Sequence, residues 1–215
     1  MHSRRRLAAD RQILLATRSS GKLRELHGIL ASAGLAGITL DDAGIEESPD
    51  EEHIEVFDTF EANALAKARY FHRLSGLPTM ADDSGLSVRA LRRAPGVYSK
   101  RYSGRADLSG QALDDANNLK LLRSLRGCDD RSASYSCAAA YVDDDLELVT
   151  MGETHGSVIE DPRGREGFGY DPYFFSSELG KTFGEAATEE KQEVSHRGRA
   201  FRALVAALRE GGRTL

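Results

Sequence analysis

Two adjacent carboxylates are the first residues whose types could do chemistry. Asp82 and Asp83 follow an apolar run at residues 77–81, which predicts a short strand, and the Ser84-Gly85 that comes next predicts a turn. Neighbouring carboxylates repel each other unless a metal ion or cations lie close by. Mg²⁺ prefers such oxygen ligands, and an Asp can also take a proton from an attacking water. The pair indicates either a metal-dependent hydrolytic site or a solvated turn.

A second candidate lies between a short apolar run at residues 13–17 and a stretch of helical spacing at residues 22–30. It consists of Thr17, Arg18, Ser19, Ser20, Gly21 and Lys22. Free N–H groups at a helix start, together with hydroxyl and ammonium donors, suit a phosphate. A Walker A loop is excluded, because it needs Gly and Ser or Thr where the chain has Ala16 and Leu23. Phosphate binding and an ordinary strand-to-helix turn both remain open.

Basic residues gather near the C-terminus. Lys191 precedes Ser195, which can cap a helix over residues 195–210, so His196 and Arg197 fall in its first turn. Cations in the first turn oppose the helix dipole. The unfavourable position of these two cations is explained if an anion or a carbonyl oxygen binds beside them. The alternative is a cluster of charged residues on the surface without a ligand.

An aromatic, glycine-rich loop is the fourth candidate. Gly167, Phe168, Gly169, Tyr170 and Asp171 precede Pro172 and predict a tight loop. Such a loop could present Phe168 or Tyr170 to a flat ring, or could simply pack.

Helical and extended patterns alternate along the chain. Further helices are expected at residues 59–74 and 113–125, and Asn63 and Lys67 share one face of the first. Strands at 134–142 and 146–154, joined by an acidic turn, predict a hairpin, with short strands at 86–88 and 173–175. The hairpin argues against an all-parallel sheet, so the fold class is mixed α/β. We expect a flexible extension over residues 1–12 and one two-lobed domain over residues 13–215.

Composition narrows the functional classes. The chain has 215 residues and a net charge of −5, so it offers no broad basic surface to nucleic acid, and the arginines at 4–6 favour a solvated extension. No apolar run approaches the roughly 20 residues of a membrane span, and no apolar stretch long enough for a signal peptide follows the basic residues at 4–11, so none is expected. Two cysteines without a CxxC pair are typical of a reducing compartment. We expect a cytoplasmic protein that binds neither membrane nor nucleic acid.

Read in order, these segments resemble the inosine triphosphate pyrophosphatase family. The resemblance runs from about residue 13 to residue 208. It is carried by six segments, namely ATRSSGK (16–22), TFEANALAKA (59–68), ADDSGL (81–86), APGVYSKRYSG (94–104), GFGYDP (167–172) and EEKQEVSHRGRA (189–200). The chain departs from the family at Ser19, where Asn is usual, at Ala62, where Glu is usual, and at Lys100, where a small residue is usual.

The resemblance implies a long curved central sheet flanked by helices, two lobes with a substrate cleft between them, and a homodimer. It implies Mg²⁺-dependent hydrolysis of ITP, dITP and XTP to the monophosphate and pyrophosphate. Carried over by motif, the catalytic residues would be Asp83 as general base, Asp82, Lys22 and Lys67, and the metal ligands Asp83 and Glu55. Substrate contacts would come from Thr17, Arg18, Ser19, Ser20, Gly21, Lys22, Ser84, Phe168, Gly169, Tyr170, Asp171, Lys191, His196 and Arg197.

The implied selectivity has a chemical basis. Hypoxanthine and xanthine carry an acceptor oxygen at C6, where adenine carries an amino donor. Arg197 or protonated His196 can donate to that oxygen but would meet the adenine amino group donor to donor. Guanine shares the C6 oxygen, so its rejection must involve its 2-amino group.

Two rival functions are less favoured. A pyrophosphatase of the Maf-like group, acting on modified pyrimidines or on dTTP and UTP, fits the segments at 167–172 and 195–200 poorly. A nucleotide-binding module without catalysis would not need the intact set of Asp82, Asp83, Lys22 and Lys67.

Overall fold

The computed structural model describes residues 12–213. The flexible extension expected at residues 1–12 lies outside this range, apart from Gln12. Within it, no helix has both the length and the apolar character needed to cross a membrane.

One seven-stranded mixed sheet organises the chain, in the order β2-β1-β3-β4-β5-β6-β7. β1 pairs in parallel with β2 and β3, whereas β6 pairs antiparallel with β5 and β7. The strands are β1 Ile13–Leu15, β2 Gly37–Thr39, β3 Thr79–Val88, β4 Ser132–Val142, β5 Glu147–Val158, β6 Phe174–Ser176 and β7 Lys181–Thr182. The mixed α/β class expected from the hairpin is confirmed.

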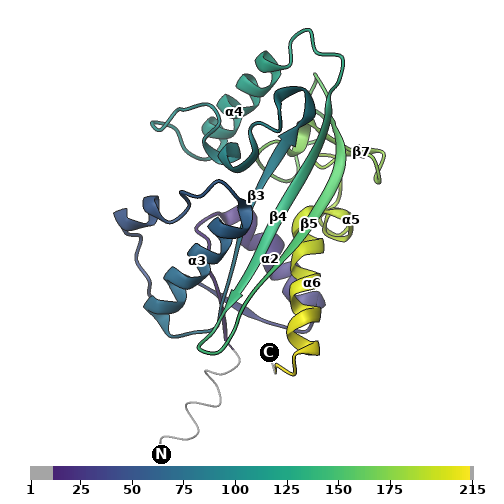
Figure 1. Ribbon diagram of the computed structural model, residues 1–215. Coiled ribbons are helices and arrows are strands. Elements are labelled where there is room, and N and C mark those ends of the chain that lie inside the picture. Colours follow the sequence, from purple (N-terminus) through teal and green to yellow (C-terminus); the bar gives the residue numbers. More distant parts are fainter. Residues whose placement is uncertain (1–11, 214–215) are drawn as a thin grey trace, which may run out of the picture. The chain divides into compact units, whose positions relative to one another are not determined.

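Five α-helices and four short 3₁₀ helices are found in residues 12–213 (Figure 1). The α-helices are α2 Ser20–Ser32, α3 Phe60–Ser75, α4 Gly110–Ser124, α5 Thr188–Val194 and α6 His196–Glu210. The 3₁₀ helices are η1 Pro49–His53, η2 Arg89–Leu91, η3 Gly96–Arg101 and η4 Asp171–Tyr173. The four expected helices are confirmed, whereas α5, β2 and β7 were not expected, because they are too short to show a hydrophobic period.

The chain divides into two compact units. Unit 1 comprises residues 1–83, 137–152 and 197–215, of which the structure describes 12–83, 137–152 and 197–213, and unit 2 comprises residues 84–136 and 153–196. β3, β4 and β5 each contribute residues to both.

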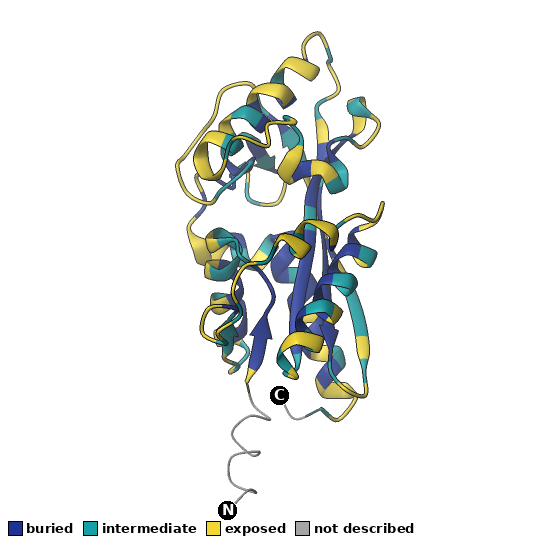
Figure 2. Ribbon diagram, turned by 90° about the vertical axis from the view of Figure 1, so that its left-hand side faces the viewer, coloured by how far each residue is buried: buried dark blue, intermediate teal, exposed yellow. Residues whose placement is uncertain are grey.

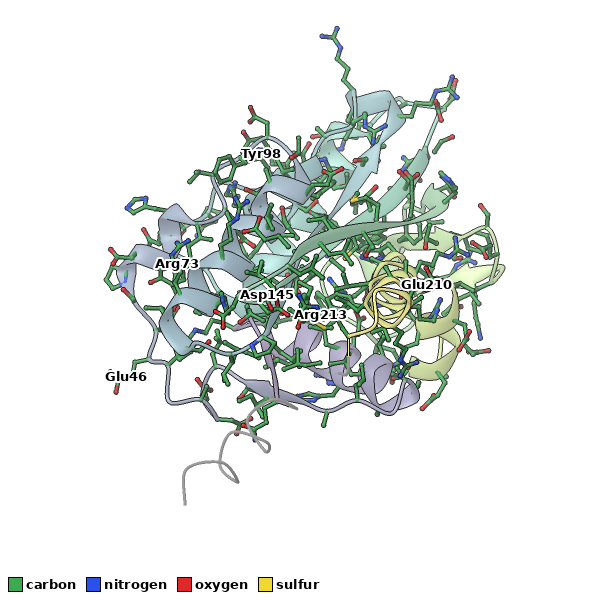
Figure 3. The ribbon with its side chains drawn as sticks, turned by 60° about the horizontal axis from the view of Figure 1, so that its bottom comes forward. Glu46, Arg73, Tyr98, Asp145, Glu210 and Arg213 are labelled. Carbon is green, nitrogen blue, oxygen red and sulfur yellow. The ribbon has the colours of Figure 1, made fainter. Side chains whose placement is uncertain are left out.

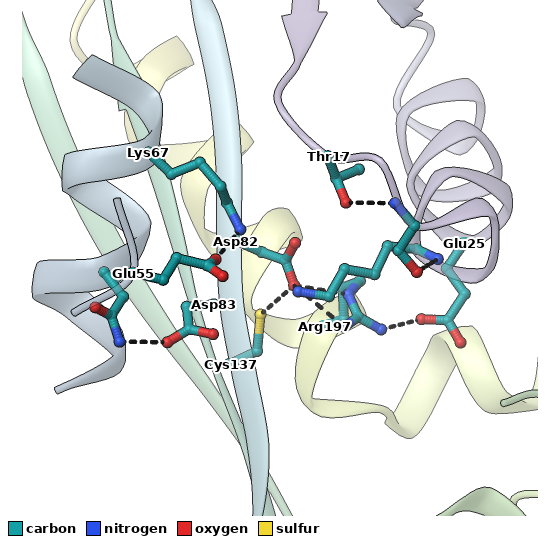
Figure 4. A network of polar contacts seen from close by, with 11 residues as sticks. Thr17, Glu25, Glu55, Lys67, Asp82, Asp83, Cys137 and Arg197 are labelled. Carbon is teal, nitrogen blue, oxygen red and sulfur yellow. Dashed lines mark hydrogen bonds and ion pairs between the residues drawn. The ribbon is translucent and has the colours of Figure 1, made fainter. Parts of the chain in front are cut away.

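In unit 1, helices cover both faces of the sheet (Figures 1 and 4). α2 and α6 lie on one face, where Leu26 and Leu30 pack with Phe201 and Leu204 against Leu15 and other buried residues. α3 lies on the other face, and its apolar stripe, Ala64, Ala68 and Phe71, is buried. Figure 2 shows the central strands of this unit, β1, β3 and β4, buried beneath partly exposed helices. Because strand side chains alternate, consecutive residues of β1 and β3 face different helices.

The hairpin predicted from the acidic turn is also confirmed. The turn between β4 and β5 closes with a hydrogen bond from the Asp143 N–H to the Leu146 carbonyl. Arg213, just after α6, forms ion pairs with Asp143 at 3.0 Å and Asp145 at 3.6 Å. Figure 3 shows Arg213 beside Asp145, so the end of the described chain is tied to this turn.

Unit 2 has its own apolar core. Leu121 and Leu125, at the end of α4, pack with Leu86, Phe174 and Phe183. The Tyr135 ring meets the Phe174 ring edge-on, with centroids 4.8 Å apart.

One local expectation was wrong, because β3 does not end before Asp82. It continues through the predicted turn to Val88. Asp-Asp-Ser-Gly has the composition of a turn, but Asp82 and Asp83 are both buried by partners from the helices on either face. Tertiary partners therefore decided the local structure at this point.

Gly156 on β5 is expected to tolerate no side chain. A Cβ there would lie 2.1 Å from the Phe175 carbonyl oxygen and 2.8 Å from the Phe174 ring. Gly156→Ala should therefore destabilise the protein by roughly 2 kcal/mol in urea unfolding. Gly211→Ala is the matched control, because its Cβ would meet the nearest atom at 3.4 Å; equal loss in both variants would contradict the prediction.

Candidate active site

The two adjacent carboxylates point to opposite faces of β3 (Figure 4). Asp82 faces α2 and α6 and contacts Lys22 and Arg197, whereas Asp83 faces α3 and accepts a hydrogen bond from Asn63. Strand alternation thus separates two charges that the sequence places side by side. The two residues therefore have different environments and different chemistry.

The Asp82 carboxylate is buried and is shared by two cations. Its Oδ2 lies 3.0 Å from Lys22 Nζ and accepts from Arg197 Nε and Nη2, each at 3.1 Å. Burial alone would raise the pKa of Asp82, but Lys22, Arg197 and Lys67 outweigh it and hold that pKa far below its usual range. Asp82 therefore stays ionised and is poorly suited to accept a proton. Its carboxylate instead binds two cations, Lys22 and Arg197.

Arg197 is held from its other side by Glu25. Its Nη1 donates to Glu25 Oε2, and only 2% of its surface is exposed. Burial would lower the pKa of Arg197, but Asp82 and Glu25 raise it. The structure thus places Arg197, expected at the base, between two carboxylates of unit 1.

Asp83 is better suited to accept a proton. Burial raises its pKa and Glu55 adds to the rise, while Lys22 and Lys67 oppose it. Asn63 Nδ2 donates to Asp83 Oδ2 at 2.9 Å, and the same amide bonds both the N–H and the carbonyl of Phe57. A raised pKa makes the carboxylate more basic, and the Asn63 amide fixes its orientation.

Glu55 and Lys67 form the third part of this group. Lys67 Nζ donates to Glu55 Oε1, and Asp83 is electrostatically coupled to both. Burial alone would lower the pKa of Lys67, but Glu55, Asp82 and Asp83 raise it, so the ammonium stays charged. Glu55, which only the family resemblance indicated as a metal ligand, therefore lies in the same electrostatic group as Asp83.

The segment before Lys22 forms the start of α2. Ser19 caps the helix, and its Oγ accepts from the Lys22 N–H at 3.4 Å. Ser and Asn cap equally well, so Ser19 preserves the helix start. Arg18 instead turns to the 41–51 loop, where it binds Glu51 at 2.8 Å and the Ile45 carbonyl at 2.9 Å.

A second group of the expected residues lies in unit 2. Lys191 Nζ binds Asp171 Oδ2 at 2.5 Å and lies 5.3 Å from the centroid of the Phe168 ring. Asp171 Oδ2 also accepts from the Phe168 N–H at 2.8 Å. Gly167 has a φ of +76°, and a Cβ on it would lie 2.0 Å from Asp171 Oδ2. The glycine is required, and Asp171 orders the loop that carries Phe168.

Two further aromatic contacts complete this group. The His196 ring stacks on Tyr135, with centroids 4.5 Å apart and planes within 7°. Tyr170 is buried, and its hydroxyl donates to the Ser99 carbonyl at 2.8 Å. The Tyr170 side chain is thus packed in unit 2, and its polar end is bonded there. Ser84 lies partly buried on β3.

Comparison with known proteins identifies the family. The model of the Ham1 family matches residues 13–207. The chain belongs to the Ham1 family. It is 47% identical over 202 residues to a dITP/XTP pyrophosphatase of Ralstonia nicotianae (93% of this chain, 97% of that one) and 46% identical over 206 residues to one of Burkholderia pseudomallei (94% and 96%). A HAM1 protein from Coxiella burnetii has the same fold, with a TM-score of 0.77 at 36% identity over 93% of this chain and 98% of that one.

In this Ham1 chain, the side chains that could bind a metal are carboxylates, which suit an ion that prefers oxygen ligands. Within residues 12–213, no group of three or more His, Cys, Asp or Glu side chains could hold an ion by itself. Glu55 and Asp83 supply two hard carboxylates, which suit a divalent ion that completes its shell with water and phosphate oxygens. A closed structural site of the zinc kind is not formed by these residues.

Glu25 was missed by the sequence reading. It lies in α2 beside apolar residues and looks like a solvent-facing acid, but it is only 9% exposed because it meets Arg197. A charged residue on the buried stripe of an amphipathic helix was the available signal.

Removing the Asp82 charge is expected to destabilise the protein strongly. Asp82→Asn leaves the Arg197 guanidinium, which is buried, short of one carboxylate. Breaking such a pair costs about 3–5 kcal/mol, measured as the free energy of unfolding in urea. Asp107→Asn is the control, because the ion pair of Asp107 with Arg105 is exposed and should contribute nothing measurable. Similar small effects in both variants would contradict the prediction.

Proposed function

We propose that this protein hydrolyses the non-standard purine nucleoside triphosphates ITP, dITP and XTP to the monophosphate and pyrophosphate, clearing damaged nucleotides from the pool. The observation that carries the proposal is the grouping of Asp83 and Glu55 with Lys22, Lys67 and Asp82 in unit 1. Two carboxylates and two lysines match the needs of a triphosphate and its metal. The names of the relatives, dITP/XTP pyrophosphatases, supply the substrate class.

In the proposed mechanism, Asp83 accepts a proton from a water whose oxygen attacks the α-phosphorus. The new P–O bond forms as the bond to the bridging oxygen breaks, and pyrophosphate leaves with that electron pair. Lys22 and Lys67 offset the charge that develops on the phosphate oxygens. Asp82 holds Lys22 in place and takes no proton, which follows from its lowered pKa.

We propose Mg²⁺ as the metal, held by Glu55 and Asp83. When bound, it neutralises phosphate charge and lowers the pKa of a bound water. Lys67 is bonded to Glu55 and so would keep that carboxylate oriented.

We propose that the start of α2 binds phosphate. The backbone from Thr17 to Lys22 and the hydroxyls of Ser19 and Ser20 offer donors at a helix N-terminus. Arg18 is engaged by Glu51 and Asp41, so its contribution is to anchor this segment.

We propose that the base is recognised by residues of unit 2, with Phe168 providing a flat apolar face and Lys191 and His196 providing donors toward the C6 oxygen. Gly169, Tyr170 and Asp171 shape the loop, and Ser84 contacts the substrate. Arg197 was expected at the base, but in the structure its guanidinium is bound by Glu25 and Asp82 of unit 1.

We further propose a homodimeric, cytoplasmic protein whose residues 13–215 act as one domain. Exposed large apolar side chains, Val56, Phe57, Leu74, Tyr98, Leu119 and Met151, are compatible with a protein interface. Both cysteines are free thiols, as expected in a reducing compartment.

The central test is a panel of ITP, dITP, XTP, GTP, ATP and dTTP with Mg²⁺, scored by released pyrophosphate. We expect preference for the first three. Asp83→Asn keeps the side-chain shape but removes the proton acceptor, so kcat for ITP should fall by about 10²-fold or more. Asp42→Asn, an exposed acid of unit 1, is the control and should not change kcat.

Three outcomes of the panel would contradict the proposal. Preference for dTTP would favour the Maf-like alternative, and binding of ITP without turnover would favour a binding module. Equal turnover by wild type and Asp83→Asn would remove Asp83 from the mechanism.

Glu55 is expected to set metal affinity. Chelation with EDTA should abolish turnover, and Mg²⁺ should restore it. Glu55→Gln removes one anionic ligand, so the Mg²⁺ concentration for half-maximal activity should rise by roughly 10- to 100-fold. Glu52→Gln, an exposed acid of η1, serves as the control. An unchanged Mg²⁺ requirement in Glu55→Gln would place the second ligand elsewhere.

A further inference from the structure

One face of α4 carries three polar side chains where an apolar stripe would be expected. Asp114, Asn117 and Asn118 lie at spacings of three and four residues, so they share this face. Asn117 and Asn118 are only 3% and 5% exposed. Asn is a poor helix former, and its buried amide is costly unless it is bonded. The structure shows partners for Asp114, for both polar atoms of the Asn117 amide and for Nδ2 of Asn118, whereas Asn118 Oδ1 is buried without one among residues 12–213.

Asp114 and Asn118 hold the backbone of Gly169 from both sides. The Gly169 N–H donates to Asp114 Oδ2 at 2.8 Å, and Asn118 Nδ2 donates to the Gly169 carbonyl at 2.9 Å. Gly169 has a φ of +64°, so the chain reverses here in a conformation that few other residues adopt. Both peptide groups that flank its Cα are thus fixed by one helix.

Asn117 makes the same kind of contact to a different loop. Its Oδ1 accepts from the Ser103 N–H at 2.7 Å, and its Nδ2 donates to the Lys100 carbonyl at 3.0 Å. One face of α4 therefore holds two separate loops by two hydrogen bonds each, one loop through Asn117 alone and the other through Asp114 and Asn118 together. Substitution of Asn117 should therefore affect the loop at residues 100–103 and leave the bonds to Gly169 in place. It can serve as a control for substitutions of Asp114 and Asn118.

The loop held by Asp114 and Asn118 is the one that carries Phe168. The Phe168 N–H is bonded to Asp171, and the Tyr170 hydroxyl to Ser99. Those two contacts fix either side of Gly169, and the α4 contacts fix Gly169 itself. Without them, the backbone between Phe168 and Tyr170 would lose the two hydrogen bonds that tie it to α4.

We propose that Asp114 and Asn118 are positioning residues that set the base selectivity of the enzyme by fixing the peptide of Gly169. The inference rests on the proposed function, in which this loop lies against the base. An enzyme can reject adenine by hydrogen-bond mismatch only if the base is held at a defined place. If the loop is loosened, adenine can shift and form hydrogen bonds with other groups, so the mismatch costs less. The expected effect is on selectivity more than on turnover, because the reacting phosphorus is remote from the base.

The experiment measures kcat/KM for ITP and for ATP in wild type, Asp114→Ala and Asn118→Ala. We expect the ratio of ITP to ATP to fall about tenfold or more, the equivalent of one lost hydrogen bond to a charged or buried group. We expect kcat for ITP in both variants to stay within about threefold of the wild-type value. The change in kcat/KM should therefore come from KM. A ratio of two rates is independent of the fraction of folded enzyme, so partial unfolding cannot mimic the result.

Asn117→Ala is the matched control. It removes two hydrogen bonds from the buried face of α4, one more than Asp114→Ala or Asn118→Ala, but both are bonds to the loop at residues 100–103. Its ITP to ATP ratio should equal that of wild type, whatever its unfolding temperature. Asp114→Asn should restore most of the ratio, since its amide oxygen can still accept from Gly169.

Phe168→Ala separates the possible failures. A wild-type enzyme without preference for ITP would overturn the proposed function and the inference together. Preference in wild type that is lost in Phe168→Ala but kept in Asp114→Ala and Asn118→Ala would overturn the inference alone. A ratio that falls equally in Asn117→Ala would show a general loosening of unit 2 and would also overturn it.

Discussion

The buried ion pair between Asp82 and the cations of α2 and α6 is the interaction on which the site depends. A carboxylate without solvent must be compensated, and Asp82 is compensated by Lys22 and Arg197 together. These contacts fix α2, which begins with the proposed phosphate-binding segment, and α6, which begins at His196. Because Asp82 occupies one face of β3, Asp83 necessarily occupies the other, where α3 supplies Asn63 and Lys67.

This separation gives two adjacent residues of one type different chemical properties. Asp82 is kept ionised by its cations, whereas the pKa of Asp83 is raised by burial and by Glu55. Lys67 stays charged because Glu55, Asp82 and Asp83 outweigh the effect of its burial. A fixed anion, a more basic carboxylate and a charged ammonium therefore lie within one small region of unit 1, as phosphoryl chemistry requires.

In unit 2, side-chain hydrogen bonds to the backbone order the loop at residues 167–172, beside the buried ion pair of Lys191 with Asp171. Asp171 orders Phe168, and Asp114 and Asn118 order Gly169. Direct bonds to N–H and carbonyl groups hold the loop in one conformation, in addition to the packing of Tyr170 in the apolar core of unit 2. The polar residues in the middle of α4 therefore stabilise the loop that they contact, in addition to forming part of their own helix.

The sequence by itself determined the family, the mixed α/β class and the main helices and hairpin. These are local properties: Ser19 and Thr59 cap the helices that follow them, and an acidic turn joins two alternating strands. It also indicated the Asp82-Asp83 pair, Lys22 and Lys67 as one chemical group. Only the tertiary structure decided that β3 runs on through Asp82-Asp83, that Arg197 lies between Glu25 and Asp82, and that α4 holds Gly169. These depend on partners up to 172 positions away in the chain, and neither spacing nor propensity carries information about such distant contacts.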